Sequence, residues 1–202
     1  MSYLKLNLVT LLFFLNIEAY YGELNLENFE IPLEWNIIQE GDIELKWTIY
    51  QGFPICKVST VLPYPIESVA KIIEDVKEYP KVFKRVHKVE LLEKNTVRIM
   101  LDMPFLLSDR DYVIKHKKSK KESTWEFSFV SENHKNAPLS KNYVRLINAA
   151  GKWEINPKNQ NETLLSYTWN GELLGNFPEF ALHRAWKTQG NEIIQWITYA
   201  LK

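Results

Sequence analysis

The chain has 202 residues, of which 46% are hydrophobic, and its 7 Trp, 10 Tyr and 10 Phe residues supply the apolar surface of a sizeable core. This composition excludes an intrinsically disordered chain. The formal net charge of zero disfavours nucleic acid as a partner, because nucleic-acid binding usually depends on a basic surplus. The single cysteine, Cys56, excludes an internal disulfide framework and lies in an apolar run, which predicts a buried, unreactive thiol.

Residues 1–19 have the layout of a secretory signal peptide. Lys5 and the amino terminus carry positive charge, a mostly apolar run follows at Leu6–Ile17, and Ala19 is a small residue at a cleavage position. The run is too short to span a membrane comfortably. We therefore expect a mature chain that begins directly after Ala19 and is soluble and either secreted or periplasmic. An amphipathic or buried amino-terminal helix is the alternative.

The segment that follows, residues 20–33, is polar and has no periodic pattern, so we expect a leader ahead of one domain at residues 34–202. Clustered apolar residues then favour a short helix at Leu33–Glu40. Alternating apolar residues predict a hairpin of two strands, Ile43–Tyr50 and Ile55–Leu62.

After the hairpin, apolar residues at steps of three and four predict a helix at Pro65–Val76, and a shorter helical segment is expected at Lys81–Val86. The period then returns to two, which predicts six strands: Val86–Glu93, Thr96–Asp102, Asp111–Lys118, Ser123–Glu132, Tyr143–Asn156 and Glu162–Gly171. A sheet with helices on one side is an α+β architecture. A sheet with this many strands is expected to curl rather than stay flat.

The carboxy-terminal stretch, Asn176–Leu201, predicts one long helix that Asn176 caps and that has Pro178 in its first turn. Its apolar residues form one stripe: Leu182, Trp186, Gly190, Ile193, Ile197 and Leu201. Such a helix is stable only when the stripe is buried, so we expect it to lie across the sheet. Gly190 costs roughly 1 kcal/mol relative to alanine in a helix, and it indicates either close packing against a strand or room for a ligand.

Two arginines lie on strand faces that are otherwise apolar. Arg110 shares a face with Tyr112, and Arg145 has a similar place on a later strand. A buried guanidinium needs a partner. We therefore expect Arg110 to meet a ligand headgroup or a carboxylate such as Asp102 or Glu172, or else to place its charge at the rim.

Four stretches, in this order along the chain, resemble the START domain, the lipid-transfer domain related to steroidogenic acute regulatory protein, within the helix-grip superfamily that includes birch pollen allergen. They are Trp35–Trp47, Leu62–Glu93, Ser108–His116 (SDRDYVIKH) and Val144–Ala185. Phe83 departs from the pattern, because many relatives have Trp there, and this leaves the ligand open.

The resemblance implies a helix-grip fold, in which a curved antiparallel sheet grips the long carboxy-terminal helix over an apolar cavity that holds one lipid or similar hydrophobic molecule. The candidate ligand-binding residues then lie on the apolar strand faces and the helix stripe: Arg110, Tyr112, Phe127, Arg145, Tyr167, Trp169, Leu182, Trp186 and Gly190. Without the resemblance, the same faces would favour an ordinary filled core.

No sequence pattern supports catalysis, a metal or another cofactor. The chain has no glycine-rich phosphate loop and no nucleophile elbow, and its four histidines have no metal-ligand spacing. We therefore expect a non-catalytic carrier or sensor, with an aromatase/cyclase-like enzyme or an interaction domain with a collapsed cavity as alternatives. We also expect a monomer that contacts membranes transiently through Lys115–Lys121 or the apolar connection Met103–Leu107.

Overall fold

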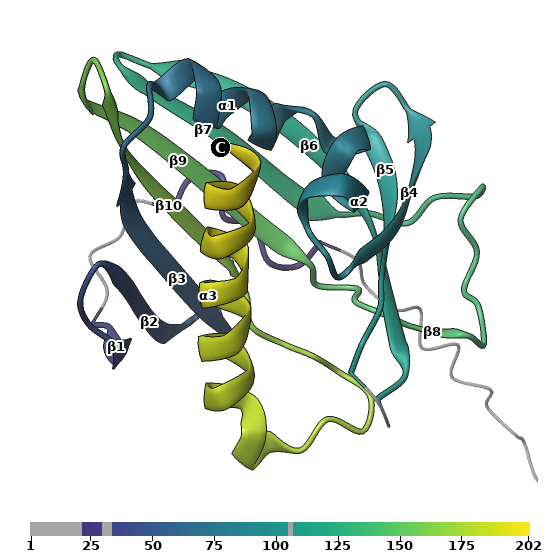
Figure 1. Cartoon of the computed structure of the whole chain (residues 1–202). Helices are drawn as coiled ribbons and strands as arrows, with labels where there is room; N and C mark the ends of the chain where they lie inside the picture. The colour runs from purple at the N-terminus through teal and green to yellow at the C-terminus, as the bar shows by residue number, and fades with distance from the viewer. Residues whose placement is uncertain (1–21, 30–33, 105–106) are drawn as a thin grey trace, which may run out of the picture.

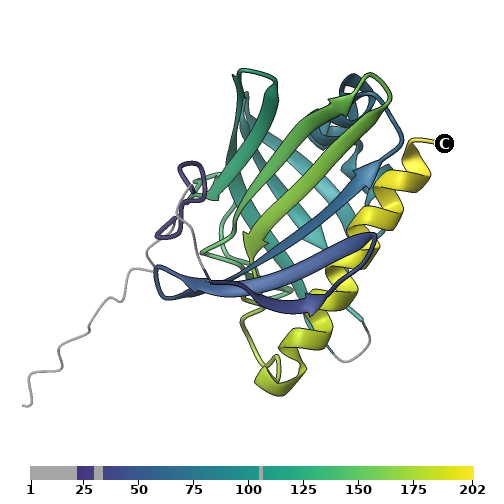
Figure 2. The ribbon, with the colours of Figure 1, turned by 90° about the vertical axis from the view of Figure 1, so that its left-hand side faces the viewer.

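The computed structural model of the chain describes residues 22–29, 34–104 and 107–202, in which one strongly curved sheet carries a long helix across its concave face (Figure 1). The side view shows the sheet bending around this helix, α3 (Leu182–Ala200), whose stripe faces the strands (Figure 2). The predicted α+β helix-grip architecture is confirmed. The predicted signal peptide, residues 1–19, lies outside the described residues.

Ten strands form this sheet within the described residues, and nine of them follow the order β1-β2-β3-β10-β9-β7-β6-β5-β4, with β8 beside β6. All neighbours in that order are antiparallel, whereas β8 pairs in parallel with β6. Because β10 pairs with both β3 and β9, it joins the amino-terminal hairpin to the later strands. The strands are β1 (Asn36–Gln39), β2 (Ile43–Tyr50), β3 (Phe53–Leu62), β4 (Val86–Glu93), β5 (Thr96–Leu101), β6 (Asp109–Lys121), β7 (Thr124–Ser131), β8 (Tyr143–Arg145), β9 (Ala150–Asn159) and β10 (Glu162–Asn170).

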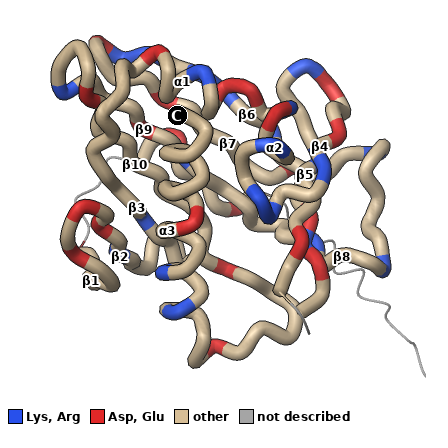
Figure 3. The backbone as a smooth tube through the Cα atoms, viewed as in Figure 1, with Lys and Arg blue, Asp and Glu red and all other residues tan. Residues whose placement is uncertain are grey.

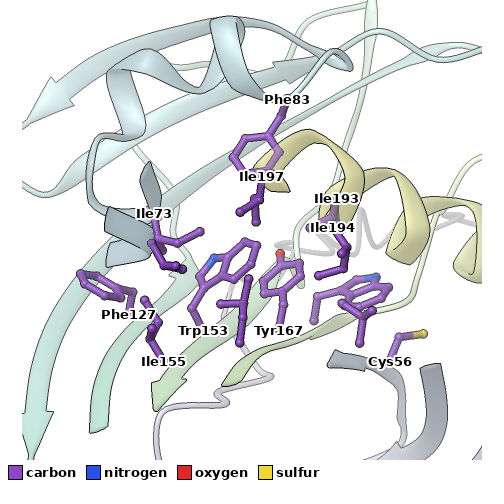
Figure 4. Close-up of a cluster of buried hydrophobic side chains, with 14 of the residues drawn as sticks. Cys56, Ile73, Phe83, Phe127, Trp153, Ile155, Tyr167, Ile193, Ile194 and Ile197 are labelled. Carbon is purple, nitrogen blue, oxygen red and sulfur yellow. The ribbon is translucent and has the colours of Figure 1, made fainter. Parts of the chain in front are cut away.

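The helices cover the concave face. After β3 come α1 (Ile66–Glu74), the 3₁₀ turn η1 (Val76–Glu78) and α2 (Tyr79–Val82), and a second 3₁₀ turn, η2 (Glu179–Ala181), leads into α3. In Figure 4 the isoleucines of α3 lie above Trp153 and Tyr167 of the sheet, which places the main core between helix and strands. Among the described residues, no helix combines the length and apolarity that crossing a bilayer would require.

The short helix predicted at Leu33–Glu40 is wrong, because Asn36–Gln39 forms the edge strand β1, paired antiparallel with β2. Nucleating a helix is costly for so short a segment. The edge of an existing sheet instead supplies backbone hydrogen-bond partners at once.

Three other predicted elements also differ in their boundaries. The strand predicted at Tyr143–Asn156 is divided, because β8 pairs with β6 whereas β9 pairs with β7 and β10, so the chain changes its pairing partners between them. The long helix begins at Leu182 instead of Asn176, since Pro178 has an extended backbone (ψ 126°) and the turn η2 follows it. The second helical segment lies at Tyr79–Val82, slightly before its predicted place.

The described part of the predicted leader, residues 22–29, packs against the convex face of the sheet. Leu24 and Leu26 are fully buried and form a second small core with Ile55 and Ala150. The packed domain therefore includes residues 22–29, ahead of the boundary predicted at residue 34. Two leucines in a polar segment give no periodic pattern, so the sequence did not reveal this contact.

We expect Leu26→Ala to lower the free energy of unfolding by about 2–3 kcal/mol, because it removes a fully buried side chain and leaves a cavity. Urea unfolding of the chain from residue 20 onward measures this loss. Leu139→Ala is the matched control, since Leu139 is 68% exposed. Equal unfolding midpoints for the two variants would contradict the packing of this segment.

Candidate ligand-binding site

A cavity lies between the concave face of the sheet and the helices that cover it. Its larger lobe has a volume of about 120 Å³, whereas a single water needs roughly 10–15 Å³ of cavity volume. Lys118 and Glu74, an ion pair of 2.8 Å with both side chains partly in solvent, line its edge. Most of the wall is aliphatic or aromatic: Ile73, Val76, Phe83, Val86, Ile99, Leu101, Ile114, Phe127, Phe129, Trp153, Ile193 and Trp196.

A smaller lobe of about 80 Å³ adjoins the larger one, toward the connection between β10 and α3. Its wall is more polar and includes Arg110, Asn148, Trp169 and Glu172. The two lobes lie side by side, because five residues line both: Leu101, Tyr112, Phe129, Tyr167 and Gln189.

Stacked aromatic rings form the floor of the cavity. Tyr167 lies between Trp153, at a centroid distance of 3.9 Å, and Trp169, at 5.2 Å, with all three rings nearly parallel. Gly151 makes room for this arrangement, since a Cβ there would lie 2.3 Å from Phe129 Cζ. The predicted residues Phe127, Tyr167 and Trp169 thus line the cavity, as does Tyr112.

The tyrosines of the floor stay protonated at neutral pH. Burial raises the pKa of Tyr112 and Tyr167 well above the usual value, and the hydroxyl of Tyr79 donates to the Ile73 carbonyl at 2.8 Å. Tyr112 and Tyr167 therefore offer neutral hydroxyl groups to the cavity. Cys56 is buried as predicted, and burial raises the pKa of its thiol, which disfavours the reactive thiolate.

Arg110 is buried and reaches the smaller lobe, but its partners are backbone carbonyls. Its Nε and Nη2 donate to the carbonyls of Leu173 and Leu174, both at 3.2 Å, and its Nη1 donates to the Ser108 carbonyl. Burial lowers the pKa of Arg110 and outweighs the negative charge of Asp109, which acts to raise it. No carboxylate pairs with it among the described residues, so the alternative of Asp102 or Glu172 as its partner is wrong. Arg110 instead anchors the β10–α3 connection to β6.

Arg145 does not line the cavity. Its Nε and Nη2 donate to the two carboxylate oxygens of Asp111, at 2.7 and 2.8 Å, and Arg98 Nη2 lies 2.6 Å from Asp111 Oδ2. Burial alone would raise the pKa of Asp111, but the hydrogen bonds and charges of both arginines outweigh it and hold this pKa below the usual value. Arg145 therefore joins β8 to β6, and its predicted place in the ligand site is not supported by the structure.

The predicted helix residues Leu182, Trp186 and Gly190 also lie outside both lobes. Trp186 Nε1 donates to the Gly171 carbonyl at 2.7 Å. A Cβ on Gly190 would lie 2.2 Å from Leu45 Cδ1. Of the two interpretations of Gly190, the structure supports close packing against the strands.

Gly190→Ala should therefore lower the melting temperature by several degrees. The overpacking cost of about 1–3 kcal/mol exceeds the gain in helix propensity of roughly 1 kcal/mol, because Leu45 is fully buried and has little space to move. Thermal melts of Gly190→Ala, Leu45→Ala and the double variant test this. If the losses in melting temperature of the two single variants simply add in the double variant, the contact with Leu45 does not cause the destabilisation by Gly190→Ala.

No protein-family model matches the chain, and no curated protein matches its sequence. Solved structures do match. Human StAR-related lipid transfer protein 5 has a TM-score of 0.79 at 17% identity, covering 87% of this chain and 90% of that one. The STAR-related lipid transfer protein of Xanthomonas axonopodis has a TM-score of 0.72 at 17% identity, with coverage of 83% and 98%.

The chain has the START fold. The di-domain aromatase/cyclase BexL is also similar, with a TM-score of 0.50 at 13% identity, covering 72% of this chain and 45% of that one. The resemblance in four sequence stretches is thus confirmed as a likeness of fold.

In this START fold, α3 contributes a set of residues to the cavity that the sequence interpretation missed. Gln189, Ile193 and Trp196 line the larger lobe, and Gln189 lines both lobes. They follow one another at steps of four and three, and Ile193 belongs to the predicted stripe, so Gln189 and Trp196 widen that stripe on one side. The helical spacing was therefore a usable signal, but the polar Gln189 concealed it.

A polar network borders the smaller lobe of the START cavity. Asn148 Nδ2 and Asn170 Nδ2 both donate to Glu172 Oε2, at 3.2 and 3.0 Å, and Asn170 Nδ2 also donates to the Asn148 carbonyl at 2.8 Å. No group of metal-ligating side chains gathers within residues 22–29, 34–104 and 107–202. The site thus offers an apolar lobe next to a lobe with hydrogen-bonding groups, which suits an amphiphilic ligand.

Proposed function

We propose that the chain binds one hydrophobic small molecule, a lipid or a compound of similar character, in the cavity beneath α3 and carries it without chemical change. The observation that supports this most is the larger lobe with its mostly aromatic and aliphatic wall, next to the smaller, more polar lobe. Apolar ligand surface buried there is stabilised by roughly 25 cal/mol per Å². The names of the two similar lipid transfer proteins support a lipid as the cargo.

Helix α3 is the natural lid of this site. Arg85 Nε and Nη2 donate to the two carboxylate oxygens of Glu192 on α3, at 2.7 and 2.9 Å, and Gln39 and Asn191 exchange two amide hydrogen bonds of 3.1 and 3.0 Å. These contacts join α3 to the segment before β4 and to β1. We propose that ligand entry requires some of them to open.

Organic extraction of the purified protein followed by mass spectrometry tests the proposal. We expect one lipid or similar molecule per chain, and a fluorescent lipid that competes with it. A protein that yields no ligand and takes up no fluorescent lipid would contradict a carrier function.

An aromatase/cyclase-like enzyme is the second candidate, since BexL has a similar fold. The hydroxyls of Tyr112 and Tyr167 are possible proton donors in the cavity, but the lining carboxylates are already engaged: Glu74 pairs with Lys118, and Glu172 accepts from two amides. An aromatic polyketide in the extract would favour the enzyme. An interaction domain with a collapsed cavity is disfavoured by the open space in both lobes.

We further propose a soluble monomer that is exported and begins near Tyr20 after signal-peptide removal. Amino-terminal sequencing of the exported protein tests the cleavage, and an intact Met1 would contradict it. Acidic and basic residues are interspersed over the elements in view, including the helices, which does not favour nucleic acid (Figure 3). Membrane contact through Lys115–Lys121 stays a proposal, and part of the alternative contact Met103–Leu107 lies outside the described residues.

A further inference from the structure

The volume of the two lobes limits how much hydrocarbon a ligand can bury. The larger lobe has about 120 Å³ and the smaller one about 80 Å³. At roughly 10–15 Å³ for each water, the two lobes together offer roughly 13 to 20 positions for groups of that size. A methylene group is about as large as a water molecule, so this space suits one hydrocarbon chain. A polar headgroup needs none of it if it stays at the partly exposed edge formed by Glu74 and Lys118.

Phe83 limits the larger lobe from within. Its buried ring follows α2 and lies 6.4 Å from the ring of Trp196 on α3 and 6.4 Å from that of Trp153 on the sheet, centroid to centroid. These are contact distances for aromatic rings. Tyr79 packs edge-on against the same ring at 4.8 Å, and all four residues line the lobe. Phe83, which lies above Trp153 in Figure 4, therefore joins the roof of the lobe to its floor.

The glycines between the helix and the sheet give no additional room. A Cβ on Gly151 would lie 2.3 Å from Phe129 Cζ, and one on Gly190 would lie 2.2 Å from Leu45 Cδ1. Both glycines therefore mark close contact between packed groups. The space for a ligand is set by the aromatic side chains around the two lobes.

We infer that, among lipids, this cavity takes those with one acyl chain and excludes those with two, and that Phe83 sets the limit. The inference rests on the proposed function, because it assumes that the cavity holds a ligand. A lipid with two chains of ordinary length needs about twice the space, so its second chain would stay in water. Each methylene group left in water weakens binding about 4-fold.

The test offers the full chain both kinds of lipid at once. Phosphatidylcholine vesicles contain equal mole fractions of 1-myristoylglycerol and 1,2-dimyristoylglycerol, and the protein is incubated with them until its lipid content no longer changes. The protein is then separated and extracted, and its lipids are measured by mass spectrometry. We expect the one-chain lipid to exceed the two-chain lipid at least about 10-fold, since two methylene groups left in water already correspond to that factor. Phosphatidylcholine, a second two-chain lipid, should be similarly depleted.

Variants that enlarge the larger lobe test the role of Phe83. Phe83→Ala removes the ring between Trp196 and Trp153 and should raise the ratio of two-chain to one-chain lipid at least about 4-fold, the factor for one further methylene group that leaves water. Trp196→Ala enlarges the same lobe from α3 and should act in the same direction. Ile194→Ala is the matched control, because Ile194 is buried on the same helix but lines neither lobe, so the ratio should stay unchanged.

Thermal melts show whether each variant is folded, and Trp196→Ala takes the place of Phe83→Ala if the latter unfolds. Equal uptake of the two glycerol lipids by the unchanged protein would overturn the inference and leave the proposed function standing. A ratio that the folded enlarging variants do not alter would overturn the role of Phe83. If the protein takes up no lipid of either kind and its own extract holds no ligand, the proposed function fails and the inference fails with it.

Discussion

Ile193→Trp should weaken the binding of a fluorescent lipid at least about 100-fold while the melting temperature stays within a few degrees. Ile193 projects from α3 into the larger lobe, so a larger side chain there occupies ligand space instead of pushing against packed atoms. Its new apolar contacts offset part of any strain. Titration of the fluorescent lipid and a thermal melt on the same sample measure both quantities.

The adjacent residue supplies the control. Ile194 lies on the same helix and is as deeply buried, but it lines neither lobe and belongs to the filled core (Figure 4). Ile194→Trp should therefore overpack the core and destabilise the fold by about 1–3 kcal/mol or more. If both variants melt equally early and bind lipid equally well, the space beneath Ile193 is not a ligand cavity.

Asp111→Ala should lower the free energy of unfolding by about 3–5 kcal/mol, because it breaks the buried ion pair with Arg145 and the pair with Arg98. Urea unfolding measures the loss. Glu78→Ala, which breaks the exposed pair with Lys81, is the control and should cost no more than about 1 kcal/mol. Similar losses in the two variants would show that the buried ion pair contributes no more than a surface one.

The same carboxylate predicts a pH dependence. Since the pKa of Asp111 is lower in the folded chain than in the unfolded one, its contribution is complete above the unfolded pKa of about 3.9 and is lost as the pH falls through the folded pKa. Asp111→Asn should therefore flatten the loss of stability below about pH 4. Unfolding curves of both chains between about pH 2.5 and 6 provide the measurement, and parallel curves would contradict the assignment.

Local pattern in the sequence was enough for most of the fold. The alternation of apolar and polar residues predicted the hairpin and most later strands, and the apolar stripe of α3 indicated that this helix lies on the sheet. The strand-face argument also found Tyr112, Phe127, Tyr167 and Trp169, because alternate residues of a strand share a face wherever that strand lies. Periodicity therefore identified the buried face of the sheet, and the family resemblance supplied the expectation of a cavity there.

Only the tertiary structure decided what each buried face meets. An apolar stripe signals burial but not whether its neighbour is a packed strand or open space, so Gly190 against Leu45 and Ile193 over the cavity look alike in the sequence. Contacts between residues far apart in the chain are equally invisible in the sequence. Arg145 pairs with Asp111, 34 positions away, and Leu26 packs on the convex face of the sheet against residues from later in the chain. The sequence by itself determined which residues leave water, because hydrophobicity and period are local. The shape of the space they enclose depends on distances between elements, which arise only when the sheet curves around α3.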